Sequence, residues 1–261
     1  MLSNFLRNQS GSRLKLLLVL LLLMAAPGCA SLFGGGDRYN IHMLETFDPE
    51  YVFVDSSIEP DAVINAFLEE YANELNVKMN RRITVSTGVI ERGQPESPLG
   101  NLTADIVRSH AARTLGKEVD IALLNRGGLR IPIPQGDVTV GTMYELMPFE
   151  NYITLLRFNG RQIRQIAEEL AIEGGEPISG LRMRIDGNRA VDLLVGGNSI
   201  DPNREYWLAT NNWMADGGGP IPTLWQPLER IDTGVLIRDA FIEHLNTRET
   251  IEPETDGRIR R

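Results

Sequence analysis

The chain has 261 residues, of which 26 are basic and 35 are acidic, and its formal net charge is −9. This length and a hydrophobic content of 42% are sufficient for a globular core. Such an acidic chain lacks the electrostatic footprint of a protein that binds a nucleic-acid polymer, although one or two local cations are enough to bind a small nucleotide.

The N-terminal segment, residues 1–28, has the layout of a secretory signal peptide. Three basic residues precede an apolar run over residues 16–26, which is too short to predict a membrane span. Removal of this acid-free leader with its three basic residues would change the net charge from −9 to about −12, since −9 − 3 = −12.

Cys29 follows Ala26-Pro27-Gly28 and is the only cysteine in the sequence, so no intramolecular disulfide is possible. It stands where a bacterial lipoprotein signal places the residue that receives lipid. The alternative is an ordinary signal peptide with a cysteine nearby by chance. Residues 29–40 are small and glycine-rich, which is typical of a flexible tether. With no Asp beside the cysteine, the similarity to lipoprotein sorting signals favours a lipid anchor in the outer membrane of the cell envelope, facing the periplasm.

Periodicity predicts the elements that follow. Between Pro60 and Leu75, apolar residues recur every four positions, which predicts an amphipathic helix within an N-terminal extension, residues 41–80. A domain is expected over residues 81–261. Its expected strands are residues 82–90, 121–124, 152–158, 181–185, 190–195 and 206–211, and its expected helices are residues 99–115, 161–171 and 235–245. Asp186-Gly187-Asn188 predicts a hairpin turn, and Thr233 is expected to cap the last helix. The interleaving predicts an α/β fold with mixed sheets.

Three motifs are spaced along this domain: ESPLGNLTAD at residues 96–105, NRGGLR at residues 125–130 and MPFEN at residues 147–151. A glycine run at residues 217–219 follows the last expected strand, and DGRI stands near the end. In this order the motifs resemble the C-terminal, substrate-recognising domain of the 5'-nucleotidase family. The resemblance covers the sequence from about Ile83 onward and implies a layered α/β/β/α arrangement.

The resemblance also implies a nucleotide- or nucleoside-binding site. Asn125 matches a residue near the base, and Arg130 matches one directed to ribose and phosphate, for which a guanidinium offers a planar fork. Gly128 lets the backbone approach a ligand closely. The family stacks the purine between two aromatic rings, whose positions Phe149 and Trp213 occupy here. The alternatives are a tight turn with a solvated arginine, and two rings that belong to the core.

Two positions depart from the family pattern. Gly219 stands where the family has an acid that holds the ribose hydroxyls, and Gly93 stands where it often has an arginine. Asp216 and Arg92 are the nearby substitutes. Each lost charge-assisted bond is worth about 1.5–3 kcal/mol, so affinity or specificity is expected to differ from the family norm.

The ESPLGNLTAD motif is expected to be structural rather than catalytic. Glu96 and Asn101 are predicted at a helix entrance, where side-chain oxygens satisfy free backbone N–H groups.

The family's metallophosphatase half holds two metals through a dense set of Asp, His and Asn ligands. This sequence has three histidines, His42, His110 and His244, which are far apart and form no His-x-His pair. A dinuclear site needs several imidazoles and carboxylates within a few ångströms of one another. We therefore expect surface or helix-face histidines, no catalytic residues, and no metal or other cofactor in this chain.

Three functions remain open. The first is the recognition subunit of a split nucleotidase, which acts with a separately encoded metallophosphatase in extracytoplasmic nucleotide hydrolysis and catabolism. The second is a non-catalytic envelope lipoprotein that binds nucleosides or nucleotides. The third is a structural envelope protein in which the fold survives without a working pocket.

Overall fold

The computed structural model describes Asp55 and residues 57–261, and a boundary between two units falls after Glu59. The elements below belong to the second unit, Pro60–Arg261. The predicted signal segment, Cys29 and the tether lie outside the described residues. No helix in the described part is both long enough and apolar enough to cross a membrane.

The predicted helix of the N-terminal extension is present as α2 (Ala62–Met79). The Asp61 side chain caps it by accepting from the N–H groups of Val63 and Ile64. Most of its apolar side chains are exposed among the described residues, with Val63 80% exposed and Phe67 63% exposed, whereas Met79 at its end is partly buried against the core. Capping and helix propensity, rather than burial of an apolar face, account for this helix within the described part of the chain.

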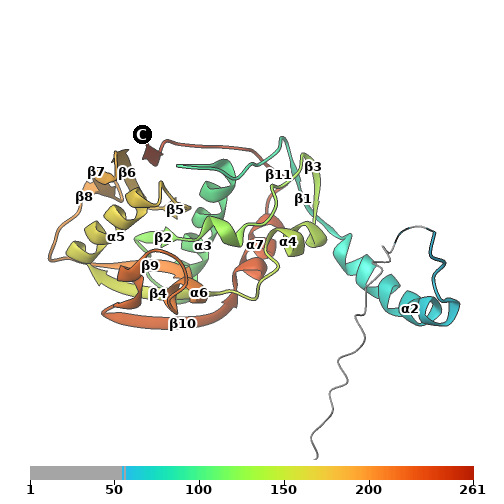
Figure 1. The fold of residues 1–261 in the computed structure, drawn as a ribbon. Coiled ribbons are helices and arrows are strands. Elements are labelled where there is room, and N and C mark those ends of the chain that lie inside the picture. Colours follow the sequence, from blue (N-terminus) through green and yellow to red (C-terminus); the bar gives the residue numbers. More distant parts are fainter. Residues whose placement is uncertain (1–54, 56) are drawn as a thin grey trace, which may run out of the picture. The chain divides into compact units, whose positions relative to one another are not determined.

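The described strands form three sheets (Figure 1). One has the order β11-β1-β3, with β1 Arg82–Ser86, β3 Gly136–Thr139 and β11 Thr250–Ile251. The central sheet has the order β10-β4-β9-β2-β5, with β2 Ile121–Leu123, β4 Tyr152–Asn159, β5 Ile178–Ser179, β9 Glu205–Asn211 and β10 Glu229–Leu236. The third has the order β12-β6-β7-β8, with β6 Leu181–Asp186, β7 Arg189–Val195, β8 Asn198–Ser199 and β12 Ile259–Arg260.

Helices cover both faces of the central sheet. They are α3 Pro98–Leu115, α4 Val140–Leu146, α5 Gly160–Ile172, α6 Asn212–Ala215 and α7 Ile237–Leu245, with short 3₁₀ turns η2 Arg126–Gly128 and η3 Pro222–Trp225. One hydrophobic cluster lies among α3, α4, α7 and one face of the sheet, and a second lies among α5, the third sheet and the other face. The predicted mixed α/β class is confirmed.

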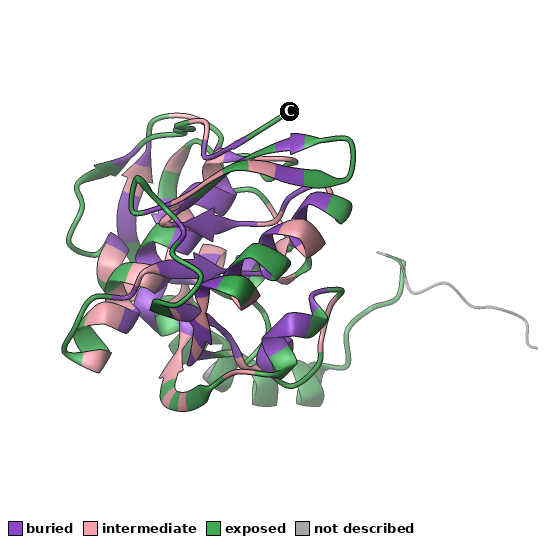
Figure 2. Cartoon of the chain, turned by 90° about the vertical axis from the view of Figure 1, so that its left-hand side faces the viewer, coloured by how far each residue is buried: buried purple, intermediate pink, exposed green. Residues whose placement is uncertain are grey.

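The central strands alternate between these two clusters. In β4, Ile153 and Leu155 belong to the first cluster, whereas Leu156 and Phe158 belong to the second. Successive side chains of a strand point to opposite faces, so a strand covered on both faces is apolar throughout. Figure 2 shows strands in the interior of the domain in the buried colour, purple.

The predicted cap of the last helix is wrong. α7 begins at Ile237 after Leu236, and no side chain caps it. β10 continues to Leu236, which pairs with Tyr152, and the Thr233 hydroxyl donates to the carbonyl of Ile153 at 2.7 Å. Pairing with β4 therefore fixes Thr233 within the sheet rather than at the helix terminus.

The entrance of α3 also differs from the prediction. Ser97 is the cap, and its hydroxyl accepts from the Gly100 N–H. The Glu96 carboxylate accepts from the Asn101 side chain at 2.6 Å and from the N–H groups of Asp256 and Gly257. The carboxylate therefore ties the C-terminal segment to α3, so this motif has a structural role, although Asn101 donates where a capping acceptor was expected.

Candidate functional site

Several strand ends meet at one edge of the central sheet. β2 and β9 run parallel, so Asn125, the second residue after β2, and Asn211, the last residue of β9, lie at the same edge. β4 runs antiparallel to β9 with Ile153 opposite Asn211, which brings the start of β4 to this edge. α7 also begins here, because the Ile237 N–H donates to the Asn151 carbonyl at 2.9 Å.

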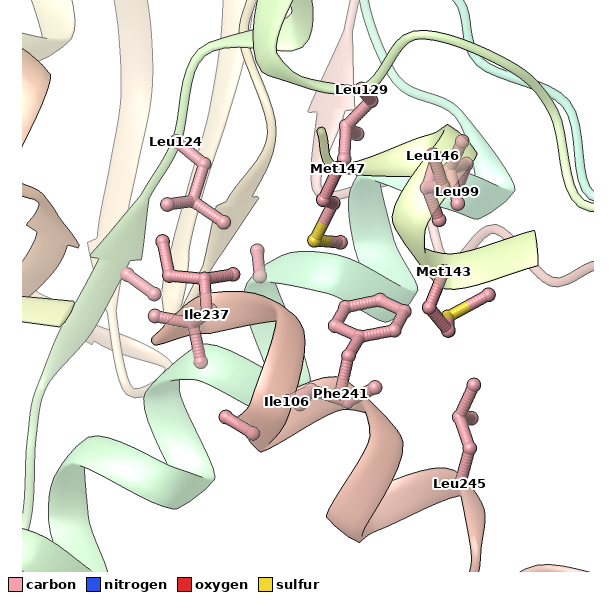
Figure 3. Packing of buried hydrophobic residues seen from close by; sticks show 14 of the residues in the cluster. Leu99, Ile106, Leu124, Leu129, Met143, Leu146, Met147, Ile237, Phe241 and Leu245 are labelled. Atoms are coloured by element: carbon pink, nitrogen blue, oxygen red, sulfur yellow. The ribbon is translucent and has the colours of Figure 1, made fainter. Parts of the chain in front are cut away.

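These segments line a narrow cleft that is partly open to solvent. Its apolar wall includes Leu124, Met147 and Ile237, and Figure 3 shows the side chains of Leu124 and Ile237 pointing toward one another. Asn125 and Gly128, two of the predicted ligand-binding residues, line the cleft. The cleft therefore joins an apolar surface to a few convergent polar groups, as small-molecule sites do.

A chain of hydrogen bonds fixes the Asn125 amide. Asn211 is 3% exposed, and its Oδ1 accepts from the Met214 N–H at 2.7 Å. Its Nδ2 donates to Asn125 Oδ1, also at 2.7 Å. Because a backbone N–H only donates, it determines which end of each amide is oxygen. The Asn125 side chain lies over Gly128, where an added Cβ would be 3.3 Å from Oδ1.

Phe149 and Arg130 lie beside one another. Phe149 lines the cleft and is 50% exposed, so one ring face is available for stacking. Arg130 is exposed and does not line the cleft; its Nη1 donates to the Gly127 carbonyl at 3.2 Å. Its guanidinium carbon is 6.0 Å from the centre of the Phe149 ring, at the outer limit of a cation–π contact.

Trp213 does not line the cleft. It lies in α6, is 46% exposed, and packs over the glycine run. A Cβ at Gly218 would overlap two indole carbons and lie 2.5 Å from the Trp213 carbonyl oxygen. This packing explains a glycine at position 218, and the structure leaves the stacking role of Trp213 an expectation.

The two nearby substitutes for missing family residues have other partners. Asp216 pairs with Arg230 at 2.6 Å, and Arg92 donates to the Leu129 carbonyl, also at 2.6 Å. Gly219, which replaces the family's acid, lies against the indole of Trp213. A Cβ added at Gly219 would lie 3.5 Å from a ring carbon of that indole. Neither Asp216 nor Arg92 lines the cleft.

Arg238 is a further cleft residue, which no motif in the sequence indicates. This residue is 6% exposed, lines the cleft, and donates from Nη1 to the Met147 carbonyl at 2.9 Å. Its guanidinium lies 3.9 Å from the centre of the Tyr144 ring. No carboxylate of the described residues lies within 4.0 Å of it, and its Nε is buried without a partner. Asn151 and Asn211 were also missed, although their positions beside strand ends were a usable signal.

Glu176 anchors the glycine-containing turn. Its carboxylate accepts from the Arg126 N–H at 2.6 Å, at the start of η2. Burial raises the pKa of Glu176, while this hydrogen bond and the charge of Arg126 act in the opposite direction. The turn that carries Asn125 and Gly128 is therefore attached to the body of the domain by a partly buried carboxyl group.

The cleft is suited to binding. Its lining consists of apolar, amide, hydroxyl, thioether and guanidinium side chains. Across residues 55 and 57–261, no group of three or more His, Cys, Asp or Glu residues is placed to hold a metal ion. His110 and His244 lie on α3 and α7, where burial lowers the pKa of each, and His42 lies outside the described residues.

The chain is similar to known proteins of one family. Residues 79–226 match the family model for the 5'-nucleotidase C-terminal domain. The chain is 31% identical over 226 residues to Endonuclease YhcR of Bacillus subtilis (strain 168), covering 81% of this chain and 18% of that protein. It is 24% identical over 208 residues to a 5'-nucleotidase of Vibrio vulnificus (strain CMCP6), covering 77% of this chain and 37% of that protein.

Among solved structures, the 5'-nucleotidase precursor from Thermus thermophilus is similar, with 29% identity and a TM-score of 0.66 over 76% of this chain and 43% of that one. The chain thus spans less than half the length of each of these relatives. On the match over residues 79–226, the chain belongs to the family of 5'-nucleotidase C-terminal domains.

Proposed function

We propose that this chain recognises nucleotides or nucleosides in the cleft at the edge of the central sheet. The observation that carries the proposal is that Asn125, Gly128 and Phe149 line one cleft, with Arg130 beside the ring. Stacking of a base on an aromatic side chain is worth about 1–3 kcal/mol. A guanidinium near the ring can hold the phosphate of a stacked nucleotide.

Calorimetric titration of the purified protein with adenosine and AMP, without added metal, tests this proposal. Phe149→Ala should weaken the binding of both adenosine and AMP, since both contain the base. Arg130→Ala should weaken the binding of AMP more than that of adenosine, since only AMP carries the phosphate. Phe67→Ala on α2 and Arg161→Ala on α5 are matched controls, because both side chains are exposed and neither lines the cleft. Unchanged binding in both cleft variants would contradict the proposal.

We further propose that the chain acts with a separately encoded metallophosphatase in extracytoplasmic nucleotide hydrolysis. Two observations support a partner: the family match is to the C-terminal domain, and the cleft lining contains no carboxylate or imidazole. Adding the protein to that metallophosphatase should raise its hydrolysis of AMP, and the Phe149→Ala variant should raise it less. Equal activity with and without the protein would rule out this role.

A non-catalytic nucleoside- or nucleotide-binding lipoprotein is the second candidate. Gly93 and Gly219 favour it, because they replace charged residues of the family and their nearby substitutes have other partners. In that case nucleotide binding should be saturable, while hydrolysis by any added metallophosphatase stays unchanged.

The proposed anchor at Cys29 places this function at the cell envelope, in the outer membrane facing the periplasm. Labelling of producing cells with a radioactive fatty acid should mark the wild-type protein and leave the Cys29→Ser variant unlabelled. Equal labelling of the two proteins would refute the anchor.

A further inference from the structure

Asn125 lines the cleft, and its amide has a hydrogen-bond donor without a partner within the described residues. The Met214 N–H requires the oxygen of Asn211, which leaves Asn211 Nδ2 to donate to Asn125 Oδ1. Asn125 Oδ1 is therefore turned toward Asn211, and Nδ2 occupies the other branch of the side chain. No side chain or carbonyl of the described residues accepts from that Nδ2.

Arg238 presents further donors. A guanidinium carries five N–H groups and no acceptor. Of these, the contact with the Met147 carbonyl uses Nη1, and stacking over Tyr144 uses only the π face. The positive charge is almost fully buried, and no carboxylate of the described residues neutralises it within 4.0 Å. A buried charge without a counter-charge favours ligand groups rich in electron density.

A purely structural role explains only part of this arrangement. One donor to the Met147 carbonyl and an aromatic contact would also be supplied by a shorter or uncharged side chain. Arg238 instead lies on the wall of the same cleft as Asn125 and Phe149; its Nε is enclosed without a partner, and no hydrogen bond within the described residues uses its Nη2. Asn125 Nδ2 and Arg238 Nη2 therefore add donors to a polar wall that also includes the Asn151 amide and the Thr103 hydroxyl.

We infer that this site selects 6-oxopurine bases, guanine and hypoxanthine, over adenine. The inference rests on the proposed function. A 6-oxopurine presents two adjacent acceptors, O6 and N7, whereas adenine replaces the first with an N6 amino group that donates. Arginine makes paired bonds to O6 and N7, and adenine would set donor against donor. Asn125 and Arg238 together are the specificity-determining residues.

Calorimetric titration of the purified protein with GMP, IMP and AMP tests the inference. GMP and IMP should both bind at least about tenfold more tightly than AMP, within the range of discrimination that one paired contact supplies. IMP matters because it shares O6 with GMP but lacks the 2-amino group. AMP binding as tightly as GMP, or IMP binding like AMP, would overturn the inference while leaving nucleotide recognition intact.

Variants separate specificity from folding. Arg238→Lys keeps the charge and a donor for Met147 but loses the planar fork, so it should reduce the ratio of GMP to AMP affinity. Asn125→Asp keeps the acceptor for Asn211 and replaces the cleft-facing donor with an acceptor, so it too should reduce the ratio. An unchanged ratio in both folded variants would refute the assignment. Absence of binding by all three nucleotides to the wild type would instead defeat the proposed function, and this inference with it.

Discussion

Replacement of Asn211 by alanine should destabilise the domain, because this side chain has two structural bonds. It caps α6 by accepting from Met214, and a lost cap of this kind costs about 1 kcal/mol. It also donates to Asn125, whose acceptor would lose its partner at a cost of about 1–3 kcal/mol when buried. Asn125 is only partly buried, so water can replace that bond in part. We therefore expect a total loss of about 2 kcal/mol.

Urea and thermal unfolding of the purified protein, followed by circular dichroism, measure this change. For a domain of this size, a loss of about 2 kcal/mol lowers the melting temperature by about 4–8 °C. Asn198→Ala is the matched control, since Asn198 is exposed and makes one bond, to the Gly196 carbonyl at 3.2 Å. The reasoning is refuted if Asn211→Ala costs no more than Asn198→Ala.

Three further outcomes follow from particular contacts. Gly218→Ala should displace the Trp213 indole and cost about 1–3 kcal/mol by overpacking, detected as a shift in tryptophan fluorescence and a lower urea midpoint; an unchanged spectrum and midpoint would contradict this packing. Burial raises the folded-state pKa of Glu176, so its stabilising contribution is present at low pH and is lost as pH rises through that pKa. Glu176→Gln should therefore gain stability relative to the wild type as pH rises above the ordinary pKa of a glutamate carboxyl, and a constant difference across a pH series of urea titrations would count against it. Phe149→Ala should weaken AMP binding by about 1–3 kcal/mol while leaving the urea midpoint close to that of the wild type, because the ring is half exposed.

Local sequence patterns predicted the buried strands well because burial on both faces leaves a simple signature. Ile121 and Leu123 pack into one hydrophobic cluster, and Ala122 and Leu124 pack into the other, so the run is apolar at every position. The hairpin between β6 and β7 was predicted for a similar reason, since the strands alternate and Gly187 adopts a positive φ of 60° in the turn.

The pattern could not show which interactions compete at element ends. Thr233 is a good capping residue by type, but pairing of β10 with β4 holds it in the sheet. The apolar spacing of α2 predicted the helix, yet it could not show that Val63 and Phe67 remain exposed. Periodicity reports the conformation of a segment, whereas burial depends on long-range partners.

The candidate site was predicted only in part. The motifs located Asn125, Gly128 and Phe149, which line the cleft together. Arg238 was missed because an arginine near the start of a helix ordinarily points to solvent. Its burial depends on Met147 and Tyr144, which lie far earlier in the chain, as the 91-residue separation from Met147 shows.

The most direct test of nucleotide recognition is a crystal structure of the purified protein soaked with a nucleoside monophosphate at saturating concentration. We predict electron density for the base against the ring of Phe149, within hydrogen-bonding distance of Asn125, and for the phosphate on the side of Arg130. An empty cleft, or a base bound elsewhere on the domain, would contradict the account.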